Sequence, residues 1–142
     1  MERTYVGGRS NETNGVMDKM SKVKFRVSPL FASTAQEKFK AYPGLKEKFD
    51  AFRATKEANP MAPFGSKDAM FSGEGNFTKA VPKLRHAHLT HDVSVFYRLS
   101  GSNPTLIDLF GLFSHDESGT GQPANIKKQK SLGKTLANQD FS

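Results

Sequence analysis

Four histidines lie within a stretch of thirty residues, and the rest of this cysteine-free chain contains none. They are His86, His88, His91 and His115. Histidine is the only side chain whose ordinary pKa places its change of charge near neutral pH. Such a cluster is typical of a site that transfers protons or binds a metal ion. We therefore expect the chemistry of this protein within residues 83–117.

Short strands are expected to hold these histidines. The sequence predicts three strands, at residues 84–90, 93–100 and 105–114. The second places Val93, Val95, Tyr97 and Leu99 on one face, and the third is apolar except for Asp108 and Gly111. Two tight turns join the strands, which favours an antiparallel meander. Because side chains alternate between the two faces of a strand, His86 and His88 share one face. The meander then returns His115 toward His88, with Asp92 at the end of the first turn.

Two histidines, a carboxylate and nearby cations suit the cleavage of RNA without a metal ion. The attacking 2′-hydroxyl must lose a proton and the departing 5′-oxygen must gain one, and two imidazoles can perform these transfers, each worth roughly 10²–10⁴ in rate. Arginine or lysine stabilises the charge that develops at phosphorus. Asp92 is expected to orient one histidine and raise its pKa. The expected catalytic residues are His86, His88, Asp92 and His115, and the expected cations beside them are Lys83, Arg85 and Arg98.

Two other interpretations of the cluster stay open at this stage. His86, His88, His91 and Asp92 are all zinc ligands by type, and their order is similar to the His-x-His-x-Asp-His signature of metallo-hydrolases. The aspartate stands at a different place in that order and further ligands are not evident, so we expect no bound metal. In the remaining interpretation the histidines are ordinary strand and turn residues, and His91 fits an exposed turn.

Composition points to one domain with a polyanionic partner. The chain has 142 residues, 36% of them hydrophobic, and its 12 phenylalanines are expected to form much of a small core. The net charge of +7 favours nucleic acid, a ribosome or an acidic protein as partner. No apolar run reaches the ~18 residues of a membrane span, and the first residues lack the apolar stretch of a signal peptide. We expect a cytoplasmic protein with no membrane association and no cofactor.

The first part of the chain is expected to form a leader, a strand and a helical hairpin. Residues 1–21 are polar and predict a flexible leader, and residues 23–28 alternate as a strand does. Ser28 and Pro29 suit the start of a helix, and residues 43–44, Pro-Gly, separate it from a second helix. Six basic residues are expected on the outer face of this hairpin: Lys38, Lys40, Lys46, Lys48, Arg53 and Lys56.

The remaining segments carry fewer signals of regular structure. Residues 60–80 are rich in Gly, Pro, Met and Phe and predict a long loop. Residues 119–142 are expected to form a basic C-terminal extension, in which Pro123 suits the start of a short helix. The glycines before Pro123 suit a phosphate cradle, and a flexible connector fits them equally well. The extension adds three expected phosphate-binding residues: Lys127, Lys128 and Lys130.

These elements and several residues resemble a known toxin family. Residues 84–99 read Leu-Arg-His-Ala-His-Leu-Thr-His-Asp-Val-Ser-Val-Phe-Tyr-Arg-Leu. They are similar to Tyr-Arg-Asp-Ala-His-x-x-x-Asp-Trp, an apolar strand and Tyr-Lys-Leu in the YafQ-type mRNA interferases of the RelE/ParE toxin superfamily. Residues 113–115, Phe-Ser-His, resemble that family's terminal Gly-Thr-His. On this match His88, Asp92 and His115 fall at family active-site positions.

The resemblance implies an α+β, RelE-like toxin domain over residues 22–118. Its elements are an N-terminal strand, an αα-hairpin and a three-stranded antiparallel meander, followed here by the basic C-terminal tail. The implied activity is endoribonuclease cleavage of mRNA on the ribosome by histidine acid–base catalysis. The implied partner, besides mRNA and the ribosome, is a cognate antitoxin, which we expect to be acidic.

The chain departs from the family pattern at several positions. The family arginine four residues before the last histidine is Gly111, and the tryptophan after the aspartate is Val93. A family histidine in the preceding loop has no counterpart, and we expect His86 to replace it. The 27 residues after His115 also exceed the usual family end. These departures keep a second function open, that of a non-catalytic toxin of the ParE type, which binds gyrase or another target without hydrolysing it.

Overall fold

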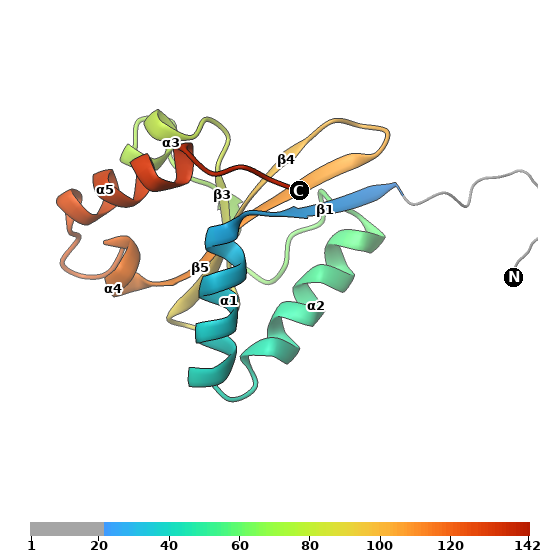
Figure 1. Ribbon diagram of the computed structural model, residues 1–142, viewed down its shortest axis with the longest axis horizontal. Helices are drawn as coiled ribbons and strands as arrows, with labels where there is room; N and C mark the ends of the chain where they lie inside the picture. Colours follow the sequence, from blue (N-terminus) through green and yellow to red (C-terminus); the bar gives the residue numbers. More distant parts are fainter. Residues whose placement is uncertain (1–21) are drawn as a thin grey trace, which may run out of the picture.

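A five-stranded sheet forms the centre of the fold, with helices on both of its faces (Figure 1). The computed structural model describes residues 22–142, so the predicted leader lies outside the described residues. The strands are β1 (Val23–Val27), β2 (Asp68–Met70), β3 (Arg85–His88), β4 (Val93–Ser100) and β5 (Thr105–Ser114). Their order in the sheet is β1-β5-β4-β3-β2, with β1 parallel to β5 and every other pair antiparallel. The predicted meander of β3, β4 and β5 is therefore confirmed.

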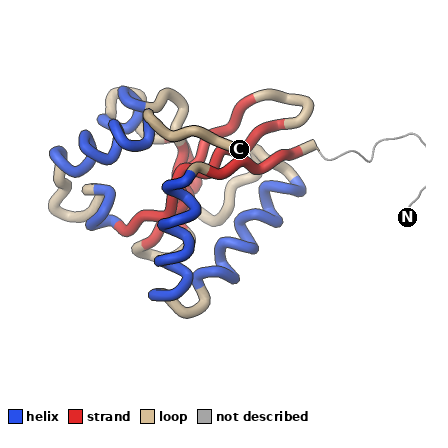
Figure 2. The backbone as a smooth tube through the Cα atoms, in the orientation of Figure 1, coloured by secondary structure: helices blue, strands red, loops and turns tan. Residues whose placement is uncertain are grey.

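The helices flank this sheet as two separate groups (Figure 2). They are α1 (Pro29–Ala41), α2 (Leu45–Ala58), α3 (Asn76–Ala80), α4 (His115–Ser118) and α5 (Ile126–Ala137). The Ser28 hydroxyl accepts a hydrogen bond from the Phe31 N–H, and Pro29 opens α1, as predicted. Gly44 has φ of 83°, a left-handed conformation that favours glycine and that ends the connection before α2. The predicted αα-hairpin is confirmed.

Each face of the sheet has its own hydrophobic core. The core under α1 and α2 contains Phe31, Phe49 and Phe52 together with the alternating residues of β4, which are Val93, Val95, Tyr97 and Leu99. The core under α3 and α5 contains Phe77, Leu84, Phe96, Phe110, Phe113 and Leu136. The histidine-bearing face of β3 belongs to this second side, since His86 pairs with Phe96 and contacts it.

The segment predicted as a long loop, residues 60–80, instead contains β2 and α3. Both elements are short, so neither carries the periodicity that predicts a strand or a helix. Strand β2 forms because it pairs with β3, with Ala69 opposite His86. The C-terminal residues also fold: α5 begins at Ile126, after the cap Asn125, rather than at Pro123. It packs on α3, and the chain then pairs Ser142 with Val27 beside β1 (Figure 1).

Two of the six basic residues predicted on the outer face of the hairpin are buried instead. Lys38 and Lys56 are 4% and 1% exposed. Lys56 donates to Asp68 Oδ2 and to the Ala62 carbonyl, at 2.6 Å in each case. Lys38 donates to Glu117 Oε2 at 2.7 Å. The prediction was wrong for these two lysines because each has a carboxylate partner far enough along the chain that helical spacing could not reveal it.

Candidate active site

His88 and His115 lie next to each other at one end of the sheet, where β3 and β5 end and β4 begins. Their ring centroids are 5.3 Å apart. His88 ends β3 and lies opposite Ser94 of β4, which in turn lies opposite Phe113 of β5. His115 follows two residues after Phe113, as the first residue of α4. The pairing of three strands thus brings together two histidines that are 27 positions apart in the sequence.

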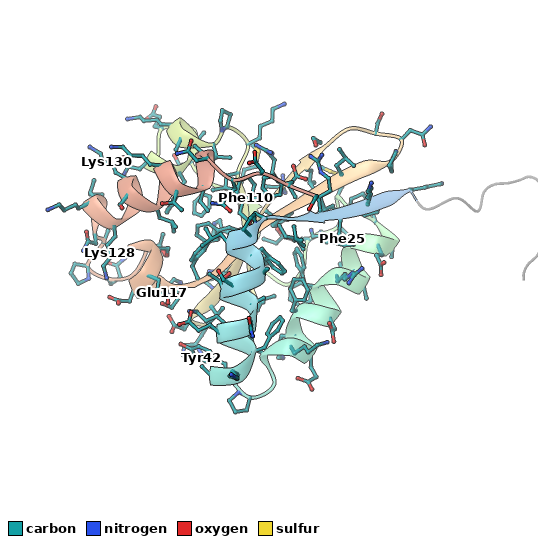
Figure 3. All side chains as sticks on the ribbon, in the orientation of Figure 1. Phe25, Tyr42, Phe110, Glu117, Lys128 and Lys130 are labelled. Carbon is teal, nitrogen blue, oxygen red and sulfur yellow. The ribbon has the colours of Figure 1, made fainter. Side chains whose placement is uncertain are left out.

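The helix that carries His115 has a strong N-terminal cap. The Ser114 hydroxyl accepts from the Glu117 N–H at 3.1 Å, and Glu117 Oε1 accepts from the Ser114 N–H at 2.9 Å. This reciprocal arrangement is a capping box, which satisfies two helix-end donors. Lys38 of α1 holds the other oxygen of Glu117, and Figure 3 places Glu117 between α4 and α1. The capping box fixes the backbone from which the His115 ring projects.

Asp92 provides a carboxylate next to His115, as the sequence predicted. Asp92 Oδ1 lies 3.7 Å from His115 Nδ1 and accepts from the His115 N–H at 3.2 Å. The Asp92 carbonyl accepts from the same N–H at 3.1 Å. Both side chains are about one third exposed or slightly more, at 35% for His115 and 40% for Asp92. The pair is therefore fixed in position and open to a ligand from solvent.

The pKa of His88 is lowered from its ordinary value. The largest cause is burial, which disfavours the charged imidazolium, and the positive charges of His115 and Lys67 act in the same direction. A histidine with a lowered pKa is mostly unprotonated at neutral pH. His88 is thus in the state that accepts a proton.

His86 belongs to an aromatic wall beside the pair of His88 and His115. Its ring stacks on Phe71 with 4.1 Å between centroids and lies 6.0 Å from the His88 ring. Burial, and then the charges of His88 and His115, lower the pKa of His86 to about 4. Its ring is consequently uncharged at neutral pH.

Two cavities open at the histidine pair. One has a volume of about 120 Å³. It is lined by His88, His115 and five neighbours, which are Phe71, His86, Ser94, Phe96 and Thr120. The other, of about 380 Å³, is lined by His88 and His115 together with the loop before β2, which contributes Phe64, Gly65, Ser66 and Lys67. The exposed turn residue His91 also lines this second cavity.

The three cations predicted beside the histidines, Lys83, Arg85 and Arg98, lie apart from the histidine pair. Arg98 donates to Asp108, beside Arg26, and lies four residues along β4 from Ser94, about 13 Å at 3.3 Å per residue. Arg85 donates to the Tyr97 hydroxyl on the opposite face of the sheet. Lys83 is exposed before β3, three positions from His86. None of these three residues lines either cavity at the histidine pair.

The lysines of α5 form an exposed basic edge near the site. Lys127, Lys128 and Lys130 are exposed, and Figure 3 labels Lys128 and Lys130 on this helix. Lys128 Nζ lies 3.3 Å from Asp116 Oδ2 and donates to the Asp116 carbonyl. Because Asp116 follows His115, this contact joins the basic edge to α4.

Lys67 is a residue of the site that the sequence did not indicate. It directly precedes β2, and its carbonyl accepts from the His88 N–H at 3.2 Å. The signal was missing because residues 60–80 were predicted as a loop, and only the pairing of β2 with β3 places Lys67 beside His88.

Within residues 22–142, no group of three or more His, Asp or Glu side chains is arranged to hold a metal ion. In the same residues, no helix has both the length and the apolar character needed to cross a membrane.

The architecture matches solved toxin structures at low sequence identity. A YoeB/ParE toxin from Agrobacterium tumefaciens matches with a TM-score of 0.53 and 16% identity, over 65% of this chain and 98% of that one. The E. coli DinJ-YafQ toxin-antitoxin complex matches with a TM-score of 0.54 and 14% identity, over 67% of this chain and 94% of the matched chain. This chain has the RelE/ParE toxin fold. A copper-bound mutant toxin from Helicobacter pylori has the same fold, with a TM-score of 0.50, 18% identity and coverage of 66% and 96%.

The RelE/ParE fold predicted from short motifs is thus confirmed, although no family model and no curated protein sequence matches the chain. About a third of the chain lies outside each structural match. On the RelE/ParE fold, the three residues placed at family positions by the sequence resemblance, His88, Asp92 and His115, lie together at one end of the sheet.

Proposed function

We propose that this protein is a toxin that cleaves mRNA by metal-independent acid–base catalysis. The observation that carries the proposal is the pair of His88 and His115, 5.3 Å apart between ring centroids and open to a cavity, with Asp92 held against His115. Two imidazoles at this separation can both reach one phosphodiester group that lies beside the pair. The fold supports the same proposal, because the matched structures are a toxin and a toxin-antitoxin complex.

His88 and His115 take opposite roles in the proposed reaction. His88, which is mostly unprotonated at neutral pH, accepts the proton of the 2′-hydroxyl as the 2′-oxygen bonds to phosphorus. His115, with the negative charge of Asp92 beside it, donates a proton to the 5′-oxygen as the bond from phosphorus to that oxygen breaks. The products are a 2′,3′-cyclic phosphate and a 5′-hydroxyl. His86 keeps its place in the aromatic wall and moves no proton.

The proposed partners follow from this activity. The substrate is mRNA, which the ribosome presents as an extended single strand in the cytoplasm. The exposed lysines of α5, Lys127, Lys128 and Lys130, are proposed to contact its phosphates. The neutralising partner is a cognate antitoxin, in line with the E. coli neighbour, which was solved as a toxin-antitoxin complex. We expect this antitoxin to be acidic, because the chain carries a net charge of +7.

Primer extension on an mRNA during translation in vitro tests the proposal. Wild type should produce discrete cuts, and His88→Ala and His115→Ala should each abolish them. Lys48→Ala is the control, because Lys48 is exposed on α2 and lines neither cavity, and it should cut as wild type does. A parallel reaction on free RNA with EDTA tests the metal question without removing the magnesium that ribosomes need. Cleavage of free RNA that stops in EDTA would contradict the metal-independent mechanism.

A second candidate function is that of a non-catalytic toxin of the ParE type. It is favoured by Gly111, which stands where the family has an arginine. Wild type that arrests growth in cells but cuts neither translated nor free RNA would support it. Arrest should then survive both histidine substitutions.

A further inference from the structure

We propose that Lys67 and Ser94 form, with His88 and His115, a binding site for a phosphate group, and that Lys67 supplies the charge that the missing family arginine would carry. The inference deepens the proposed function and rests on it for the identity of the substrate, since the phosphate is that of the scissile RNA linkage. Neither Lys67 nor Ser94 was indicated by the sequence.

Strand pairing aligns the members of this site in one row across the sheet. Asp68 pairs with Ala87, so Lys67 comes opposite His88, and the hydrogen bond from the His88 N–H to the Lys67 carbonyl confirms that alignment. His88 in turn pairs with Ser94. Side chains directly opposite each other point to the same face, with Cβ atoms about 4.5–5.5 Å apart. Lys67, His88 and Ser94 therefore present their side chains together.

Ser94 has a buried hydroxyl without a protein partner. The residue is 4% exposed and lines the smaller cavity beside His88 and His115. No residue among 22–142 makes a hydrogen bond with its side chain. Buried polar groups are nearly always hydrogen-bonded, so a lone one needs an explanation. A phosphate oxygen bound in this cavity, beside the two histidines, would supply the acceptor that the Ser94 hydroxyl lacks.

Lys67 is a free cation on a fixed backbone. It is exposed, it lines the larger cavity, and it makes no ion pair with the carboxylates of the described residues. The next residue, Asp68, accepts from Lys56 Nζ at 2.6 Å, from the Phe64 N–H at 2.8 Å and from the Tyr97 hydroxyl. This buried anchor holds the backbone of Lys67 in place, which leaves only the side chain to be ordered by a ligand.

The position of the missing arginine is physically closed. A Cβ atom at Gly111 would lie 2.5 Å from Cζ of Phe113, whose ring covers the glycine on the histidine-bearing face. Phe113 is part of the second core, so an arginine at position 111 would have to displace a packed ring. The cation must therefore come from another part of the chain, and Lys67, directly before β2, lies opposite His88.

Titration with inorganic phosphate, followed by the histidine ring resonances in NMR spectra at constant ionic strength, tests the site. Phosphate should shift the resonances of His88 and His115, whereas chloride should not. The dissociation constant should rise at least tenfold in Lys67→Met and severalfold in Ser94→Ala, and Lys67→Arg should stay near wild type. Lys48→Met and Ser102→Ala are matched controls on exposed positions away from the row, and amide spectra verify that each variant is folded.

The same variants separate this inference from the proposed function. On RNA, Lys67→Met should lower kcat about 100-fold with a much smaller change in KM, as expected for a group that stabilises charge in the transition state. If wild type binds phosphate but does not cleave RNA, the proposed function is contradicted and the phosphate site is still supported. Dissociation constants for Lys67→Met and Ser94→Ala within twofold of wild type, or unmoved histidine resonances in wild type, would overturn the inference.

Discussion

Lys38 Nζ lies 2.7 Å from Glu117 Oε2, and this contact joins α1 to the short helix that begins with His115. The lysine is 4% exposed, so it serves this contact rather than the surface of the hairpin. Burial opposes the ionisation of Glu117, but the hydrogen bonds from Lys38 and Ser114 outweigh it and keep the pKa of Glu117 below its ordinary value. A catalytic candidate is thus positioned through a helix on the other side of the sheet.

Lys38→Met should weaken both the fold and the cleavage. A hydrogen bond between charged groups contributes about 1.5–3 kcal/mol, and we expect a loss of unfolding free energy near the lower end because Glu117 is 42% exposed. Cleavage should fall about tenfold, because the capping box of α4 loses its support. Urea denaturation and RNA cleavage measure the two effects. The control is Glu37→Gln. Glu37 is exposed and lies farther from Lys38 Nζ, at 3.4 Å, so this variant should change neither the unfolding free energy nor the cleavage rate.

Cleavage should depend on pH through the lowered pKa of His88. The base must be unprotonated and the acid protonated, so kcat/KM should follow a bell-shaped profile. The midpoint of its acidic limb, which reports the base, should lie below pH 6.5, the ordinary pKa of histidine. The positive charge of Lys67 contributes to that lowering, and Lys67→Met should therefore move the midpoint to higher pH. The measurement is kcat/KM on free RNA between pH 5 and 9. A profile that is flat over this range would rule out histidine as the base.

His86 should contribute to the pH dependence of stability and not to catalysis. Its pKa is about 4 in the folded protein and about 6.5 when exposed. Unfolding therefore takes up a proton between these values, and stability should fall as pH decreases from 6.5 to 4. His86→Phe preserves an aromatic ring against Phe71 and should reduce this slope, which urea denaturation at several pH values measures. Loss of cleavage in a folded His86→Phe protein would return His86 to the catalytic set.

The buried pair of Lys56 and Asp68 should be among the most sensitive positions in the chain. Both side chains are inaccessible, at 1% and 0% exposure. Lys56→Met leaves the charge of Asp68 buried without its cation, which should lower the unfolding free energy by about 3–5 kcal/mol. Adding Asp68→Asn to that variant should recover part of the loss. A double variant that is no more stable than Lys56→Met alone would contradict the pairing as the cause.

The lysines of α5 should set the salt dependence of RNA binding. Each contact between a lysine and a phosphate of single-stranded RNA contributes about 0.7 to the slope of log affinity against log salt concentration. Lys127→Ala and Lys130→Ala should each reduce the slope by about this amount, as measured by fluorescence anisotropy with a catalytically inactive protein. Lys48→Ala on α2 is the control. A slope that stays constant in both α5 variants would exclude this helix from RNA contact.

Local signals in the sequence determined much of the fold. The alternation in β4, the apolar run of β5, the cap at Ser28 and the break before α2 depend on neighbours a few residues apart, and the structure has them where the pattern predicted. The same alternation placed His86 and His88 on one face, and the meander brought His115 to His88. Short-range geometry is sufficient for such features, because a strand or a helix repeats the same conformation at each residue.

Only the tertiary structure decided which charged side chains lie beside the histidines. Strand β2 exists through its pairing with β3, and that pairing alone puts Lys67 beside His88. Asp108 holds Arg98 away from the histidines, and Phe113 closes the position of Gly111. A charged side chain is directed by its partner, and these partners come from different strands. Register and burial depend on contacts distant in the sequence, which no local pattern records.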